Sequence, residues 1–268
     1  MNGLLNEKQR DRYSRQLMVD MVGDAEQASL LESSALVVGA GGLGAAVIQY
    51  LAAAGVGTLG IVDDGTVKRS NLQRQVIYGV DDLGEPKVER AARFVEALNP
   101  DVDVERHRIR IDPDVDETII ERYDVIVDGL DNFPGRFVVN DLARLSNVPF
   151  VHGGVYGFEG QMTTFRSGGP CYRCLVPEAP DQDSIPSGEP MGVFSPLPGT
   201  IGCLQATEAL KLLSDVGTPI SELLRYDALD VEFIRTPIEP DPACPICGSD
   251  AVDSFDEIEY DDRYRIRR

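Results

Sequence analysis

An apolar segment that runs directly into a glycine-rich turn is the feature that most constrains how this chain can fold. Residues 35–38 are apolar, and the sequence GAGGLG follows at once, before apolar residues at helical spacing. Glycines in such a turn allow close backbone approach, and the following helix offers unpaired N–H groups to phosphate. We therefore predict a nucleotide site at Gly39, Gly41, Gly42 and Gly44. A sheet of the same kind without nucleotide is the alternative.

Short apolar segments alternate with helical patterns beyond this turn. The predicted strands cover residues 35–38, 58–62, 103–109, 124–128 and 149–154. The helix after the glycine turn is followed by predicted helices at 85–98, 113–122 and 132–146. Strands that alternate with helices of this length form a parallel sheet covered by helices on both faces. The predicted fold class is α/β, with a Rossmann-like, doubly wound and mostly parallel sheet.

Residues 1–248 are predicted to form a single domain. Its consecutive parts are N-terminal helices, a nucleotide-binding half, a crossing loop rich in Pro, Gly and Ser, and a C-terminal part: 1–33, 34–166, 167–198 and 199–248. Long loops without periodicity are usually functional in a compact domain. The C-terminal part has a predicted helix near 199–214 and two strands near 222–237. The charged residues 249–268 are predicted to form a flexible tail.

The net charge excludes some classes of partner. The chain has a formal charge of −20 at pH 7, and its only lysines are Lys8, Lys68, Lys87 and Lys211. Such a composition suits a salt-rich, halophilic cytoplasm, in which screening relieves self-repulsion. An acidic partner-binding face is the competing interpretation. Nucleic-acid binding is disfavoured in both cases, because it needs a basic surface.

The sequence also predicts a cytoplasmic protein without a membrane segment. No run of about 18 apolar residues is present, as a membrane-spanning helix would require. The first residues, MNGLLNEKQRDRYSRQ, are charged and polar and lack the apolar core of a signal peptide.

Polar residues follow the predicted strands at the edge where ligands of such sheets bind. Asp63 and Asp64 follow the second strand, and Asp63 can accept hydrogen bonds from ribose hydroxyls. The further candidates are Asn71, Arg74, Gln75, Lys87, Asp131 and Asn132. Singly, each of these further candidates is more simply a surface residue or a helix cap. Together they favour ATP with Mg²⁺ over NAD, because a triphosphate needs cations and a metal.

Four of the five cysteines form two C-x-x-C pairs. Cytosolic pairs of this kind are more often metal sites than disulfides, and two such pairs can meet in a closed tetrahedral zinc site. We predict a structural Zn²⁺ at Cys171, Cys174, Cys244 and Cys247 that fastens the crossing loop to the C-terminal strands. Two unrelated reduced pairs are the alternative. Cys203 lies in an apolar helical run and is predicted to be a core thiol.

The ordered motifs of this sequence resemble the ThiF/MoeB/HesA family, relatives of the ubiquitin-activating enzymes. The resemblance runs from Asp11 to Cys247 through DRYSRQ, GAGGLG, SNLQRQ, GEPKVE, GFEGQ, PCYRC, LPGTIGCLQATEALK and CPICG. It implies ATP-dependent adenylation of the C-terminal glycine carboxylate of a ubiquitin-like protein that ends in Gly-Gly. It also implies residue roles: nucleotide binding by Gly42 and Asp63, phosphate binding by Asn71, Arg74 and Lys87, Mg²⁺ binding by Asp131, and insertion into the neighbouring subunit of a homodimer by Arg15.

The sequence departs from many relatives in the crossing loop. Where they carry a further cysteine, this chain has Gly188, and the neighbouring Ser187 is a poor nucleophile without an activating base. We therefore expect adenylation without a thioester on this protein, and a separate sulfur donor or acceptor. A nucleotide-binding paralogue that acts as a scaffold or regulator is the alternative. His107 and His152 are expected to be structural or surface residues.

Overall fold

The computed structural model describes residues 4–180 and 192–266. Its centre is one eight-stranded sheet in the order β3-β2-β1-β4-β5-β6-β7-β8. The first five strands in the chain pair in parallel, and the last three continue the sheet in antiparallel fashion. The strands are β1 (Ser34–Val38), β2 (Thr58–Val62), β3 (Asp103–His107), β4 (Val125–Asp128), β5 (Phe150–Tyr156), β6 (Glu159–Phe165), β7 (Leu223–Asp227) and β8 (Glu232–Thr236).

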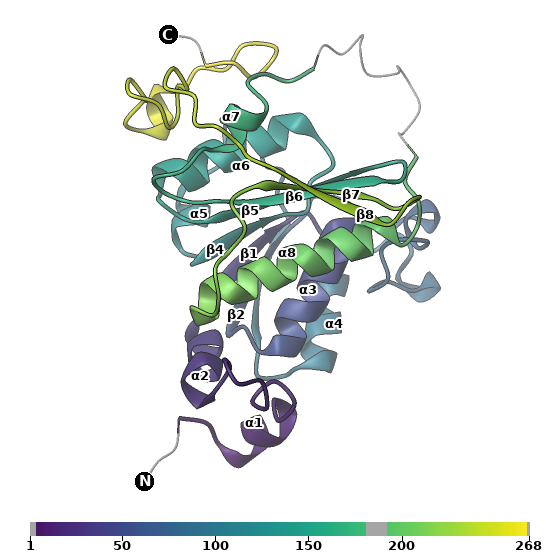
Figure 1. The fold of residues 1–268 in the computed structure, drawn as a ribbon. Coiled ribbons are helices and arrows are strands. Elements are labelled where there is room, and N and C mark those ends of the chain that lie inside the picture. Colours follow the sequence, from purple (N-terminus) through teal and green to yellow (C-terminus); the bar gives the residue numbers. More distant parts are fainter. Residues whose placement is uncertain (1–3, 181–191, 267–268) are drawn as a thin grey trace.

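Helices cover both faces of the sheet (Figure 1). One face carries α3 (Gly42–Ala54), α4 (Lys87–Leu98) and α8 (Leu197–Ser214). The other carries α5 (Thr118–Glu121), α6 (Phe133–Leu145) and α7 (Tyr172–Leu175). The N-terminal helices α1 (Glu7–Arg12) and α2 (Asp24–Glu32) lie at the end of the molecule opposite the C-terminus (Figure 1).

Side-chain alternation along the central strands produces two cores. Ala35 and Val37 of β1 belong to the core under α3 and α8, whereas Leu36 and Val38 belong to the core under α6. Because successive side chains of a strand point to opposite faces, a strand that is apolar throughout must be covered on both sides. The predicted doubly wound and mostly parallel fold is confirmed.

Two elements differ from the sequence-based prediction. The predicted helix at 113–122 is reduced to α5, because the carboxylates of Asp112 and Asp116 accept hydrogen bonds from the backbone N–H groups two residues further on. Strand β6 was not predicted, since it begins with Glu-Gly-Gln and shows little apolar alternation there. It pairs with β5 over its whole length and extends the sheet.

The predicted crossing loop contains helix α7, and residues 181–191 of it lie outside the described part of the chain. Residues 249–266, predicted to belong to a flexible tail, contact helix α6. The Tyr264 ring stacks on Phe137 of α6, and the Tyr260 hydroxyl donates to Asp141 Oδ2 at 2.9 Å. Aromatic side chains of the tail thus cover apolar surface on α6.

None of the helices formed by residues 4–180 and 192–266 is long and apolar enough to cross a membrane.

Candidate active site

The turn between β1 and α3 is shaped by glycines that leave no space for side chains. Gly39 has φ of +98°, in the left-handed region, and a Cβ there would lie 2.6 Å from the carbonyl oxygen of Gly129. A Cβ on Gly44 would lie 1.8 Å from the carbonyl oxygen of Gly39. Helix α3 starts at Gly42 with Gly41 as its N-cap, so its first N–H groups point out of the turn without a side-chain cap.

Asp63 at the end of β2 holds this turn in place. Its Oδ2 accepts from the backbone N–H of Ala40 at 2.9 Å, and its Oδ1 accepts from the N–H of Gly65 at 2.8 Å. Lys87, the first residue of α4, lies 3.3 Å from Asp63 Oδ2 through its Nζ. Tyr78 adds a hydrogen bond from its hydroxyl to the carbonyl of Ala40 at 2.9 Å. Asp63 and Lys87 are therefore an ion pair beside the glycine turn.

A cavity of about 210 Å³ opens at the carboxyl edge of the sheet. Among the predicted site residues, Gly39, Asp63, Asp64, Asp131 and Asn132 line it. Its remaining lining comes from the strand ends and from Ile109, Arg110 and Ile111. Sequence reasoning missed these three because the strand was predicted to run to residue 109, whereas β3 ends at His107. Their place after the third parallel strand was the available signal.

Of the predicted site residues on the segment after β2, Arg74 and Gln75 lie beside the glycine turn. Arg74 passes alongside Gly42, since its Cγ would be 3.4 Å from a Cβ added there, and its Nη1 donates to the carbonyl of Ser70. Asn71 ends a short 3₁₀ helix, Arg69–Asn71, and its carbonyl accepts from two backbone N–H groups. Gln75 is buried next to Gly41, and its Oε1 has no partner among the described residues.

Asp131 and Asn132 occupy the turn between β4 and α6. Asn132 is the N-cap of α6, and its Oδ1 accepts from the N–H of Gly135 at 2.9 Å. Asp131 is exposed and faces the cavity. An exposed carboxylate next to this cavity has the hard oxygen atoms that Mg²⁺ prefers.

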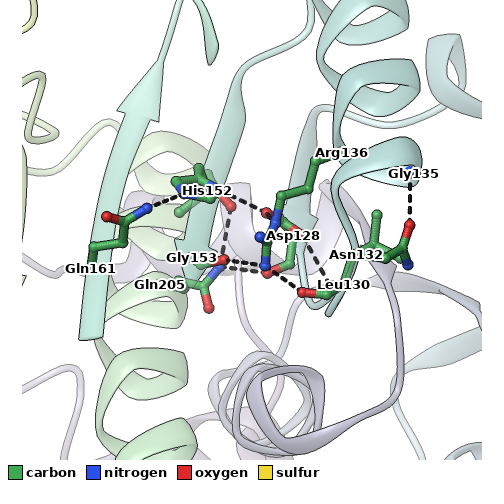
Figure 2. Close-up of polar contacts among 10 residues, drawn as sticks. Asp128, Leu130, Asn132, Gly135, Arg136, His152, Gly153, Gln161 and Gln205 are labelled. Carbon is green, nitrogen blue, oxygen red and sulfur yellow. Dashed lines mark hydrogen bonds and ion pairs between the residues drawn. The ribbon is translucent and has the colours of Figure 1, made fainter. Parts of the chain in front are cut away.

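A buried polar network lies directly beneath this turn (Figure 2). Asp128 Oδ2 accepts from Arg136 Nε at 2.9 Å and from His152 Nδ1 at 2.7 Å. Gln161 lies 3.2 Å from the other ring nitrogen of His152, and Gln205 Nε2 donates to the carbonyl of Asp128 at 2.8 Å. His152 is thus structural, as predicted.

Within this network the Asp128 carboxylate is charged, whereas the His152 imidazole is neutral. Burial lowers the pKa of His152, and its bond to Asp128 does not compensate, so the imidazole is neutral. Burial by itself raises the pKa of Asp128, but the charge of Arg136 and the hydrogen bonds from His152 and Leu130 outweigh it and lower that pKa. The carboxylate is therefore ionised.

Arg15 does not join the other predicted site residues. Its side chain is exposed. The residues around it contact the last residues of two helices: Arg12 donates to the carbonyl of Leu98 in α4, and Gln16 donates to the carbonyl of Ala54 in α3. Helix α3 extends from Gly42 to Ala54, roughly 20 Å at 1.5 Å per residue. Within one chain, Arg15 and the glycine turn are thus at opposite ends of α3.

The four cysteines predicted to bind zinc come together. Their sulfur atoms all lie within 4.8 Å of one another, with Cys171 and Cys244 at 3.6 Å and Cys174 and Cys247 at 3.4 Å. Thiolates around a tetrahedral Zn²⁺, each at about 2.3 Å, are about 3.8 Å apart, so the cluster fits this ion. Cys203 is half-buried on α8 rather than fully in the core, and burial raises its pKa.

Comparisons with known proteins agree with this fold and place the chain in a family. The model of the ThiF family matches residues 13–246. The SAMP-activating enzyme E1 of Haloferax volcanii is 52% identical over 96% of this chain and 95% of its own length. The sulfur carrier protein adenylyltransferase of Thermus thermophilus is 45% identical over 90% of this chain and 91% of its own. The fold of E. coli MccB, crystallised with ATP, covers 92% of this chain and 76% of its own with a TM-score of 0.79 at 21% identity.

The glycine turn, the ion pair and the acidic cavity edge lie together where the order of the parallel strands reverses, which is the place where α/β proteins of this kind bind ligands. The chain belongs to the ThiF family, and it is an adenylyltransferase.

We expect His152 to make the protein less stable as the pH falls below about 6.5, its ordinary pKa. Its folded-state pKa is lower, so in this range the unfolded chain binds a proton that the folded chain does not, which favours unfolding. Asp128 changes the stability in the same direction, because its folded-state pKa is also lowered. Its effect occurs only in more acid solution, below the ordinary pKa range of an aspartate.

The measurement is urea unfolding at pH 7.5 and 5.5 of the wild type and of His152→Asn, whose amide can donate from the position of Nδ1. The wild type should lose more unfolding free energy between the two pH values than the variant. Equal losses would contradict a buried neutral histidine.

Proposed function

We propose that the chain uses ATP and Mg²⁺ to adenylate the C-terminal glycine carboxylate of a ubiquitin-like sulfur-carrier or modifier protein. The names of its relatives support this substrate class, since one is a SAMP-activating enzyme and another a sulfur carrier protein adenylyltransferase. The observation that carries the proposal is the clustering of the glycine turn, Lys87 and Asp131 at one edge of the sheet, next to a cavity.

The reaction needs no general base on this chain. A C-terminal carboxylate is already ionised at neutral pH, and it attacks the α-phosphorus of ATP while pyrophosphate leaves. Catalysis then depends on positioning and on charge stabilisation. The N–H groups at the start of α3 face the phosphates, and Asn71, Arg74 and Lys87 supply donors and positive charge beside them. Asp131 would hold Mg²⁺, which would supply further positive charge to the triphosphate.

We propose a homodimer in which Arg15 enters the partner's site. Two observations support it. Arg15 is exposed and lies at the opposite end of α3 from the glycine turn of its own chain. Next to it, Met18, Val19 and Met21 expose 72%, 54% and 60% of their surface, which an interface would cover.

The acidic composition supports a salt-adapted, cytoplasmic protein as part of the same proposal. The acidic side chains behind the net charge of −20 would repel one another strongly in dilute solution and less in concentrated salt.

We also propose that the cysteine cluster holds one structural Zn²⁺ per chain. With four thiolates the ion has no open position, so it holds α7 against the segment of Cys244 and Cys247 without taking part in the reaction. Elemental analysis should find about one zinc per chain, lost in Cys171→Ser but kept in the control Cys203→Ser. A stable preparation of the wild type without metal would contradict this site.

The absence of a thioester on this protein stays part of the proposal, although Ser187 and Gly188 lie outside the described residues. With ATP and a Gly-Gly-ended partner, we expect an adenylate on the partner and no thiol-sensitive adduct between the two proteins. Cys203→Ser should keep full activity, because a half-buried thiol with a raised pKa is a poor nucleophile. A thioester on Cys203, detected by mass spectrometry, would be the contrary result.

Lys87→Ala and Asp131→Ala are each expected to lower partner-dependent ATP–pyrophosphate exchange by at least about a hundredfold. Each removes a charge that stabilises the transition state in the proposed reaction. The matched control is Lys211→Ala. Lys211 also pairs with a carboxylate, that of Glu208, at 2.8 Å, but both of these residues lie on α8. This variant should retain its exchange activity.

Undiminished exchange in both site variants would overturn the assignment of these residues. A wild type that binds ATP and its partner but forms no adenylate would instead favour the scaffold or regulator alternative.

A further inference from the structure

We propose that the buried ion pair between Asp128 and Arg136 is a positioning device, which holds the turn that carries Asp131 and so presents the Asp131 carboxylate to the cation bound with ATP. The inference rests on the proposed function, because it assigns the cation to Asp131.

The ion pair fixes both backbone groups of Leu130, the residue before Asp131 (Figure 2). Asp128 Oδ1 accepts from the N–H of Leu130 at 2.9 Å, and Arg136 Nη2 donates to its carbonyl at 2.5 Å. Arg136 Nε closes the ring by donating to Asp128 Oδ2 at 2.9 Å. The two peptide units that flank the Leu130 Cα, the second of which leads into Asp131, are therefore each held by a charged side chain.

The residue after Asp131 is held as well. Asn132 caps α6 through its bond with the N–H of Gly135, so its backbone position follows the start of that helix. Arg136 lies on the first turns of the same helix. Asp131 is thus an exposed residue between two constrained ones, and its own side chain makes no hydrogen bond or ion pair among the described residues that would orient it otherwise.

The ion pair is itself immobilised by three hydrogen bonds to two further elements, β5 and α8. His152 of β5 donates to Asp128 Oδ2, and Gln205 of α8 donates to the Asp128 carbonyl. Arg136 Nη2 also donates to the carbonyl of Gly153 at 3.1 Å. Asp128, His152 and Gln205 are fully buried. A rearrangement of the pair would therefore leave several buried polar groups without partners.

Stability alone does not account for such a group of residues. A buried ion pair contributes little net stability compared with apolar side chains of the same size, because desolvation offsets its attraction. What the pair does provide is a fixed turn at the cavity. Residues that orient a metal ligand typically change metal affinity by about 10-fold to 100-fold when they are removed.

The test is Asp128→Asn, with Mn²⁺ as the probe for the divalent cation. Electron paramagnetic resonance measures Mn²⁺ binding to the complex of the full-length protein with ATP. We expect the Mn²⁺ concentration for half-saturation to rise about tenfold or more. ATP binding in solution freed of divalent cations, measured by calorimetry, should stay within about twofold of the wild type, because the phosphate-binding residues are untouched.

Asp141→Asn is the matched control. Asp141 is also fully buried on α6 and also paired with an arginine, Arg173, at 2.6 Å, but this pair does not contact the Asp131 turn. Its loss should leave Mn²⁺ binding unchanged. Arg136→Lys is a milder second variant: one ammonium cannot replace the guanidinium bonds to Asp128, Leu130 and Gly153 together, so Mn²⁺ binding should weaken in the same direction.

Wild-type Mn²⁺ binding in folded Arg136→Lys or Asp128→Asn would overturn the positioning role, as would an equal shift in Asp141→Asn. Failure of the proposed function has a different signature. In that case the wild type itself would bind ATP without recruiting Mn²⁺, or would not bind ATP.

Discussion

Two turns of this protein meet through glycines at the point where the order of the parallel strands reverses. A Cβ on Gly39 would lie 2.6 Å from the Gly129 carbonyl oxygen, and a Cβ on Gly129 would lie 2.4 Å from that of Gly39. This close approach brings the glycine turn after β1 against the turn after β4 that carries Asp131. A side chain at either position would force the turns apart and would separate the helix N-terminus from the acidic edge of the cavity.

The second constraint is electrostatic. A chain of charge −20 is predicted to bind an anionic nucleotide, so its field must be reversed locally. The fold does this by placing Lys87 at the start of α4 and Arg74 beside Gly42, while Asp63 keeps Lys87 partly buried next to the turn. Screening by salt acts less on such partly buried pairs than on the exposed acidic surface, so the site can keep its charge pattern where the surface charges are screened.

Helix α6 connects this site with the C-terminal part of the chain. Near its start, Arg136 holds the Asp131 turn through Asp128. Further along, Asp141 binds Arg173, which lies between Cys171 and Cys174, and accepts from Tyr260 of the tail. Helix α6 is therefore linked to the cysteine cluster through Arg173, to the tail through Tyr260 and to the Asp131 turn through Arg136.

The sequence by itself determined the parallel half of the sheet, the glycine turn and the four cysteines, because strand–helix alternation, glycine spacing and paired cysteines are local patterns. It also placed Asp63, Lys87 and Asp131 at one edge, since parallel strands all end there. Only the tertiary structure decided the rest. Asp63 pairs with Lys87, His152 reaches Asp128, β6 extends the sheet and Tyr264 covers Phe137, because each depends on contacts between residues that no local pattern brings together. Arg15 is an intermediate case. Its sequence motif is a local pattern, but its position relative to any nucleotide site would depend on how two chains assemble.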